Sequence, residues 1–344
     1  VLRTGTPVHG VLFTHHASGF SLGYSIDGLS AWFLLVLAVV AVPIAIFSLG
    51  YVGGPHWNRR SAFLGATFNV LLGAVELVFV ASDLVTFLCA WELMTLTTAA
   101  LVATEHEARK NRRAAYLYLV MSHLGTGFLI AGFMILASLY HSLSFATLLS
   151  GGLSIGPIRH ILFAFFFAGF GVKAGMVPLH VWLPEAHPAA PTSISALMSG
   201  VLIKTGIYGM VRVCAFGLGV PRLSWSVIVV VVGGLSAVLG VLYALMQHDI
   251  KRLLAYHSIE NIGIILLGLG AGMMGLTYGR NDVAAIGLAA SLYHVLNHAA
   301  FKSLLFIGAG GVLTATGTRQ IEQLGGLLRR MPWTSLCFLV GAMA

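Results

Sequence analysis

Nine apolar stretches, each long enough to cross a lipid bilayer as a helix, limit what this chain can fold into more than any other feature. They lie at about 29–50, 61–81, 83–103, 115–139, 159–178, 192–216, 225–246, 253–274 and 284–309, and a tenth begins near residue 333. A spanning helix needs about 20 apolar residues, because the hydrocarbon core is about 30 Å thick. Only 9% of the 344 residues are charged and 58% are hydrophobic, which excludes a soluble fold. We therefore predict an all-α, polytopic transmembrane helix bundle.

The positive charges alternate between the loops that join these stretches. Eleven Lys and Arg residues fall in the loops after the first, third, seventh and ninth stretches, at 59–60, 109–113, 251–252 and 319–330. The opposite loops and their flanks hold only Arg159, Arg212, Arg222 and Arg280. The positive-inside rule then places the basic loops in the cytoplasm. We expect the membrane to be a prokaryotic inner membrane. The net charge of +8 is explained by these loops, so we expect no nucleic-acid partner.

Residues 1–27 have neither a basic start nor a small-residue cleavage site, and we expect an extracytoplasmic loop rather than a signal peptide. The chain looks cut at both ends, since it begins with Val1 and stops inside an apolar run. Cys89, Cys214 and Cys337 have no metal-binding or disulfide-framework spacing. Neither a catalytic triad nor a nucleotide-binding motif is present, so we expect no cofactor, no metal and no catalytic centre in this chain.

Four charged residues stand in the middle of apolar stretches: Glu92, Lys173, Lys204 and Lys302. Each costs about 2.5–3.5 kcal/mol at the bilayer centre unless it is paired or faces water, so a functional role is the default explanation. The alternatives are structural ion pairs between helices and long side chains that reach the membrane interface. Two further acids, Glu76 and Glu260, are as well explained by structure as by function. We keep them as accessory candidates, together with His257.

Lys302 belongs to a polar stripe with His294 and His298, at positions i, i+4 and i+8 of one predicted helix. Four residues turn a helix by about 400°, so the three side chains lie nearly above one another. A row of titratable groups can pass protons along. Hydrogen-bonded core histidines are the alternative, and a metal pair is disfavoured because no carboxylate or cysteine joins that face.

The stretch around Lys173 is followed by a segment rich in proline, with four of the ten prolines between 178 and 191. Proline removes an amide donor and clashes with the preceding turn, so we predict that the helix breaks near Gly175 and Pro178 and resumes as a short helix around Pro184. Broken backbone at membrane depth is tolerated where it is buried or lines a water-filled cavity. Close helix packing is the alternative explanation for the glycines.

A mechanism follows from the chemistry of buried lysine. Desolvation can bring the pKa of a lysine down by several units, to where it gains and loses a proton near neutral pH. We predict that Glu92 and Lys173 form a coupled pair on neighbouring helices. We also predict that Lys204 and His298 both point into the bundle, so that a lateral proton path can join them.

Residues 91–96 (Trp-Glu-Leu-Met-Thr-Leu) and 173–187 (Lys-Ala-Gly-Met-Val-Pro-Leu-His-Val-Trp-Leu-Pro-Glu-Ala-His) resemble a known family. It comprises the antiporter-like membrane subunits of respiratory complex I, multi-subunit sodium/proton antiporters and energy-converting hydrogenases. The similarity continues through 203–209, 249–256 and 294–302. Within the family, residues 91–94 and 258–263 are most similar to the hydrogenase-4 and formate hydrogenlyase type.

The resemblance implies a fourteen-helix subunit with two inverted five-helix repeats, each containing a broken helix. It divides this chain into a loop (1–27), a leading helix (28–58), a first repeat (59–218) and a truncated second repeat (219–344). The implied first half-channel uses Glu92, Lys173 and Lys204; the central axis and second half-channel use His294, His298 and Lys302. The family's exit residue would lie beyond Ala344, and Glu76 matches no functional position of the family.

The leading interpretation is a proton-translocating subunit of a membrane-bound hydrogenase or complex-I-like oxidoreductase. Its expected partners are other antiporter-like subunits, quinone- or hydrogenase-module subunits and the lipid bilayer. A secondary antiporter that exchanges Na⁺ for protons without a redox partner is the alternative. A scaffold that does not pump is disfavoured, because the buried charges are kept at an insertion cost.

Overall fold

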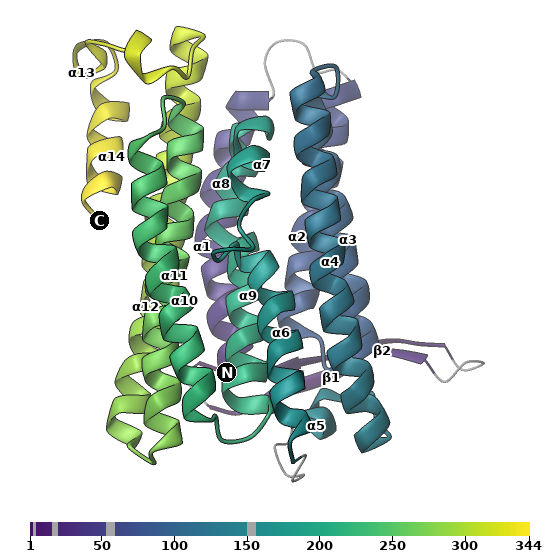
Figure 1. The fold of residues 1–344 in the computed structure, drawn as a ribbon. Helices are drawn as coiled ribbons and strands as arrows, with labels where there is room; N and C mark the ends of the chain where they lie inside the picture. Colours follow the sequence, from purple (N-terminus) through teal and green to yellow (C-terminus); the bar gives the residue numbers. More distant parts are fainter. Residues whose placement is uncertain (3–4, 16–19, 53–58, 150–155) are drawn as a thin grey trace.

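The computed structural model describes residues 1–2, 5–15, 20–52, 59–149 and 156–344, which form a bundle of roughly parallel and antiparallel helices (Figure 1). Within these ranges eight helices are long and apolar enough to cross a membrane. They are α1 (Gly28–Val52), α2 (Arg59–Val80), α3 (Leu84–Val102), α4 (Arg109–Tyr140), a composite helix over residues 192–217, α10 (Leu223–Leu245), α11 (Ile250–Thr277) and α12 (Asn281–Thr316). The predicted polytopic transmembrane bundle is confirmed.

The remaining elements are short. They are η1 (Ala103–Glu105), α5 (Phe145–Leu148), α6 (Ile158–Ala174), α7 (Leu183–Ala189), η4 (Ile321–Gln323), α13 (Leu327–Arg330) and α14 (Pro332–Met343). Of the nine predicted full spans, eight correspond to the long helices. The ninth, at 159–178, is α6, which stops earlier than predicted.

The interruption after α6 lies where the glycine and prolines predict it. Gly175 adopts φ = 75°, a left-handed conformation that glycine tolerates best, and it ends α6. The chain then runs through turns past Pro178 before α7 begins, with Pro184 in the first turn of α7. Proline is accepted there because the first amides of a helix have no partner within the helix. The predicted break is confirmed, and the division of the chain into two repeats remains a prediction.

The composite helix is the centre of the bundle. It consists of α8 (Thr192–Leu197), the π-helical segment η2 (Met198–Leu202), α9 (Ile203–Gly209) and a second π-helical segment, η3 (Met210–Gly217). All of its most apolar window is buried, against 28% for α10. Glycines allow this close packing: a Cβ on Gly206 would lie 2.5 Å from the carbonyl oxygen of Phe170 in α6. Lys204 on α9 is therefore enclosed within the bundle, with 0% of its surface exposed.

Aspartates start two of the long helices. The Asp83 carboxylate accepts a hydrogen bond from the Thr86 amide at the start of α3 (2.8 Å), and Asp249 accepts from the amides of Lys251 and Arg252 at the start of α11. These carboxylates satisfy amides that have no partner within the helix and complement the helix dipole.

The amino-terminal segment, which we predict to be an extracytoplasmic loop, contains two strands. Strands β1 (Val8–His15) and β2 (Phe20–Ile26) pair as an antiparallel hairpin at the end of the bundle that carries α5 (Figure 1). The amide of Gly23 bonds Asp83, and Tyr24 bridges to Ala81, so the hairpin rests on the start of α3. Apolar and polar residues do not alternate regularly along β1, so the sequence does not predict a strand there. Residues 16–19, between the two strands in the sequence, lie outside the described residues.

Candidate proton path

Lys173 lies near the end of α6, and its side chain is 2% exposed. Its ammonium group donates hydrogen bonds to Thr95 Oγ1 and to the Tyr118 hydroxyl, both at 2.9 Å. The rings of Trp91 and Tyr118 lie 5.5 and 5.2 Å from the same nitrogen. Hydroxyl oxygens and aromatic faces can hold a cation, so these contacts can stabilise the ammonium group without a carboxylate partner.

Glu92 and Lys173, predicted to be a coupled pair, do not form an ion pair within the described residues. Oε2 of Glu92 lies 3.4 Å from Nε2 of His123 on α4, and its Oε1 is enclosed with no hydrogen-bond partner among the described residues. Glu92 precedes Thr95 by three residues on α3, so the hydroxyl that binds Lys173 lies one turn further along the same helix. Among the described residues, Lys173 therefore bonds Thr95 and Glu92 approaches His123, and no ion pair joins the two predicted partners.

Lys204 is fully buried in the central helix. Its ammonium donates to the carbonyl of Ser199 in the π-helical segment η2, and the Ser199 hydroxyl lies 2.7 Å from that of Ser258 on α11. A π-helical turn shifts the main-chain hydrogen bonds and is often found at functional sites, where it leaves a carbonyl for another donor. Local winding thus provides the acceptor for this lysine.

The stripe on α12 faces Lys204. His298 and Lys302 are 0% and 2% exposed, and the charge of Lys204 acts on both His294 and His298. The rings of His294 and His298 are nearly parallel, with centroids 6.3 Å apart. Both ring nitrogens of His298 lack a hydrogen-bond partner within the described chain. The sequence-predicted stripe and Lys204 therefore meet in the interior.

A cavity of about 380 Å³ opens beside this stripe, between α11, α12 and α14. His257, Glu260, Asn261, His294 and Lys302 provide its polar lining. Glu260 pairs with His257, and Nε2 of His294 lies 2.9 Å from Oδ1 of Asn261. The cavity therefore brings the two accessory candidates on α11 together with the stripe. In the part of the chain that the structure describes, no cluster of three or more His, Cys, Asp or Glu residues could hold a metal ion.

Glu76 is the predicted site residue that the structure leaves apart from the others. It is exposed on α2 and lines a shallow groove with Leu34, Gly73 and Leu93. None of the buried lysines lies on that groove. Consecutive residues of a helix point in different directions, so Glu76 is exposed although the preceding residue, Val75, is buried.

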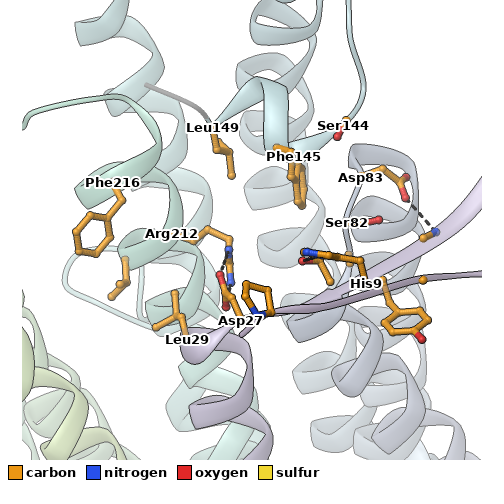
Figure 2. Close-up of a pocket in the computed structure, with 18 of the residues that line it drawn as sticks. His9, Asp27, Leu29, Ser82, Asp83, Ser144, Phe145, Leu149, Arg212 and Phe216 are labelled. Atoms are coloured by element: carbon orange, nitrogen blue, oxygen red, sulfur yellow. Dashed lines mark hydrogen bonds and ion pairs between the residues drawn. The ribbon is translucent and has the colours of Figure 1, made fainter. Parts of the chain in front are cut away.

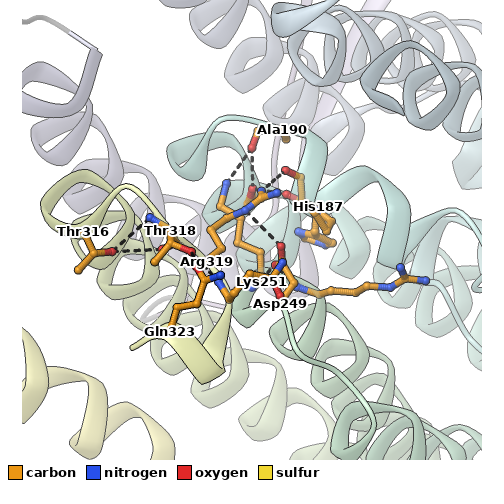
Figure 3. Close-up of polar contacts among 12 residues, drawn as sticks. His187, Ala190, Asp249, Lys251, Thr316, Thr318, Arg319 and Gln323 are labelled. Atoms are coloured by element: carbon orange, nitrogen blue, oxygen red, sulfur yellow. Dashed lines mark hydrogen bonds and ion pairs between the residues drawn. The ribbon is translucent and has the colours of Figure 1, made fainter. Parts of the chain in front are cut away.

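Sequence reasoning assigned Lys251 to a basic loop, and the structure corrects this. Lys251 begins α11, is 2% exposed, and its Nζ donates to the carbonyl of Ala190 at 2.9 Å (Figure 3). The Arg319 guanidinium donates to the carbonyl of Pro188 at 2.6 Å and pairs with Asp249. These basic side chains satisfy carbonyls at the end of α7, where the helix leaves acceptors without partners. The Asp–x–Lys spacing at the start of α11 is the only sequence signal for this.

His187 on α7 is a second residue that sequence reasoning missed as a site. Its side chain is 0% exposed, neither ring nitrogen has a hydrogen-bond partner among the described residues, and its ring stacks on Phe306 with centroids 4.9 Å apart. It belongs to the motif that carries the family resemblance, which was the available signal. Lys251, Lys302 and Lys204 all act on this ring electrostatically.

At the opposite end of the bundle, a cavity of about 950 Å³ lies under the hairpin (Figure 2). Arg212 of η3 makes a bidentate ion pair with Asp27, at 2.7 and 2.9 Å. Burial opposes the charge of Asp27, but its hydrogen bonds to Arg212 and to the Ser30 amide outweigh this and keep the pKa of Asp27 below its ordinary value. The pair ties the hairpin segment to the central helix.

Comparison with known families agrees with this architecture. The family described as NADH:quinone oxidoreductase/Mrp antiporter matches residues 81–344, and the amino-terminal family of complex I chain 5 matches residues 13–60. The chain is an integral membrane protein and belongs to the NADH:quinone oxidoreductase/Mrp antiporter family.

The chain is also similar to individual proteins of this family. The chain is 40% identical to hydrogenase-4 component B of Escherichia coli over 92% of its own length and 47% of that protein. It is 37% identical to formate hydrogenlyase subunit 3 of the same organism, covering 94% of this chain and 51% of that one. A chain of the Mrp complex from Dietzia sp. superposes with a TM-score of 0.85 at 25% identity, over 99% of this chain and 61% of that chain. The chain thus spans about half the length of the curated relatives it matches.

Proposed function

We propose that this chain is a proton-translocating, antiporter-like subunit of a membrane-bound hydrogenase or complex-I-like oxidoreductase. The observation that carries this is the set of three lysines at membrane depth, Lys173, Lys204 and Lys302, each at most 2% exposed. Within the described ranges none of them forms an ion pair with a carboxylate. Purely structural charges would be expected to pair, because an unpaired buried charge is costly.

The order of the groups gives the path its direction across the bundle. Glu92, Thr95 and Lys173 lie on α3 and α6, and α6 packs against α9, where Lys204 lies. Lys204 then faces His298 and Lys302 on α12, and the cavity beside them contains Glu260. Water molecules can bridge the intervals of a few ångströms between such groups. A proton can therefore move laterally from one lysine to the next.

Repulsion between neighbouring cations drives the transfer. Lys204 and Lys302 are near enough to interact electrostatically. Two ammonium groups in an apolar interior repel each other, so a proton that arrives on one favours release from the other. Movement of Glu92 relative to Thr95 would alter the field at Lys173 and start this sequence. Redox energy from partner subunits supplies the work, and this chain needs no redox cofactor of its own.

Orientation and partners follow from the loops and the relatives. The start of α2, the start of α4 and α13 lie at one end of the bundle, and the hairpin lies at the other (Figure 1). These helix segments contain Arg59, Arg109, Lys110, Arg329 and Arg330. The positive-inside rule makes the basic end cytoplasmic in a prokaryotic inner membrane. Similarity to components of hydrogenase-4 and formate hydrogenlyase supports a redox complex over a free-standing Na⁺/H⁺ antiporter.

Replacement of the central lysines tests the function. In vesicles that contain the assembled complex, Lys204→Met and Lys302→Met should each lower redox-driven proton translocation by about tenfold or more, while the complex still assembles. The matched control is Lys110→Met, the same chemical change at an exposed position of a basic loop. Proton uptake is followed with a pH-sensitive dye, and electron transfer is measured in parallel. Normal translocation in both assembled variants would refute the proposal.

A further inference from the structure

We infer that His187 and Lys251 form the access branch of the proton path, joining the central lysines to the basic-loop face. This inference rests on the proposed function. It adds a route to one surface, through two residues whose placement sequence reasoning did not anticipate. Three features carry it: the unpartnered ring of His187, the buried position of Lys251, and the place of α7 between the centre and the basic end.

The surroundings of the His187 ring favour a role in proton transfer over a structural role. A buried histidine that serves structure normally has a hydrogen bond on at least one ring nitrogen, since each buried polar atom without a partner costs about 1–3 kcal/mol. Both nitrogens of His187 lack a partner among the described residues, although the ring is 0% exposed. Stacking on Phe306 orients the ring, and the main chain of Ser195 also acts on it. Each nitrogen is thus free to accept or donate a proton.

Lys251 is placed at the outer end of this branch. Its ammonium binds the carbonyl of Ala190, three residues beyond His187, and the same lysine starts α11 beside the basic loops. Two basic neighbours, Arg252 and Arg319, bond Glu185 and the Pro188 carbonyl from more exposed positions. Those arginines hold α7 in place. Lys251 is the buried member of the group, and a lysine, unlike an arginine, can release its proton.

Charge links the branch to the central groups. Lys251, Lys302 and Lys204 all act on the ring of His187, from α11, α12 and α9 respectively. Lys251 in turn interacts electrostatically with Arg319, Asp249 and Glu105, which lie at the basic end. The ammonium of Lys251 passes its proton to a neutral nitrogen of His187, and the other ring nitrogen releases one to the neutral amine of Lys302 or Lys204. Each step exchanges one N–H bond for another, directly or through water, without electron transfer.

His187→Phe separates a carrier from a structural residue. Phenylalanine keeps a ring stacked on Phe306 and removes two nitrogens that have no partner, so the variant should assemble and unfold at the same temperature as the unmodified chain or higher. A structural role predicts unchanged proton translocation. The access role predicts a loss of about tenfold or more in redox-driven translocation by the assembled complex in vesicles. The matched control, His248→Gln, alters an exposed histidine on the same face and should leave the rate unchanged.

Lys251→Arg and Lys251→Met complete the test. Arginine keeps the charge and the hydrogen bond to Ala190 but cannot deprotonate, so both variants should be equally slow if Lys251 carries protons. If Lys251 only holds α7 in place through its hydrogen bond to Ala190, Lys251→Arg should keep the normal rate of proton translocation and Lys251→Met should not. Should Lys251→Arg fail to assemble, His187→Phe decides the matter. Full translocation in assembled His187→Phe, with Lys204→Met inactive, would overturn the access branch alone. Full translocation in Lys204→Met as well would overturn the proposed function.

Discussion

The ammonium of Lys173 lies 2.9 Å from the hydroxyl of Thr95, one helical turn beyond Glu92 on α3. The carboxylate itself approaches His123 on the adjacent helix. The acid and the lysine that were expected to pair thus have different partners among the described residues. We propose that Glu92 acts on Lys173 electrostatically, without the lasting neutralisation that a direct ion pair would cause.

Thr95→Val should slow proton translocation several-fold without preventing assembly. Valine keeps the shape of threonine but removes one of the two hydroxyl acceptors of Lys173, and hydrogen bonds to charged groups contribute about 1.5–3 kcal/mol. Thr98→Val is the matched control, because the Thr98 hydroxyl is buried and, among the described residues, bonds the carbonyl of Met94 within α3 rather than a lysine. Dye-monitored translocation in vesicles measures both. Equal rates in the two variants would show that the Thr95 contact is dispensable.

Glu260 and Glu76 should behave differently when their charge is removed. Glu260 lines the cavity beside Lys302, whereas Glu76 is exposed on the far side of α2. We expect Glu260→Gln to reduce translocation by several-fold and Glu76→Gln to leave it within experimental error. The ratio of proton translocation to electron transfer is the measurement. A greater effect of Glu76→Gln would place the path along the α1–α2 groove instead.

The Asp27–Arg212 pair should stabilise the fold in a pH-dependent way. Because the folded state lowers the pKa of Asp27, the stabilisation is fully present above the unfolded pKa of about 3.9 and is lost as pH falls through the lower folded value. Asp27→Asn should therefore lower the unfolding temperature in detergent at neutral pH. The difference from the unmodified chain should shrink below about pH 4.

Asp282→Asn is the control for this pair, because Asp282 also bonds an arginine, Arg280, but both side chains are at least 60% exposed. Exposed ion pairs contribute little to stability. A difference between Asp27→Asn and the unmodified chain that persists undiminished into acid would contradict the assignment of the effect to the Asp27 charge.

Gly206→Ala should destabilise the bundle by about 1–3 kcal/mol, the usual cost of overpacking. The added Cβ would lie 2.5 Å from the Phe170 carbonyl and 2.8 Å from the Ala174 amide, and backbone atoms of α6 cannot move aside cheaply. Gly65→Ala, in α2 with nothing within 4 Å of the added carbon, should be neutral or stabilising because alanine favours helix. Thermal unfolding of both variants in detergent tests this; equal stability would contradict the close α6–α9 contact.

Local sequence determined the spanning helices and the break. In a bilayer every main-chain polar group must find a partner within the protein, so a run of about 20 apolar residues has helix as its main option. Pro178 cannot continue α6, and Gly175 accepts the left-handed conformation that ends it. The stripe of His294, His298 and Lys302 was also readable, because helical periodicity alone puts the three on one face.

Tertiary structure decided which partner each charged group meets. Whether Lys173 reaches Glu92 or Thr95, and whether Lys251 points to water or to the Ala190 carbonyl, depends on helices that are 61 to 78 residues apart in the chain. Hydropathy and residue spacing do not predict contacts between helices that are far apart in the chain. Periodicity predicts the face on which a side chain lies. Only the packing of α7 against α11 and the stacking of His187 on Phe306 of α12 place His187 where three lysines act on it. The sequence by itself therefore determined where the chain crosses the membrane, and close packing between distant helices decided which groups can exchange a proton.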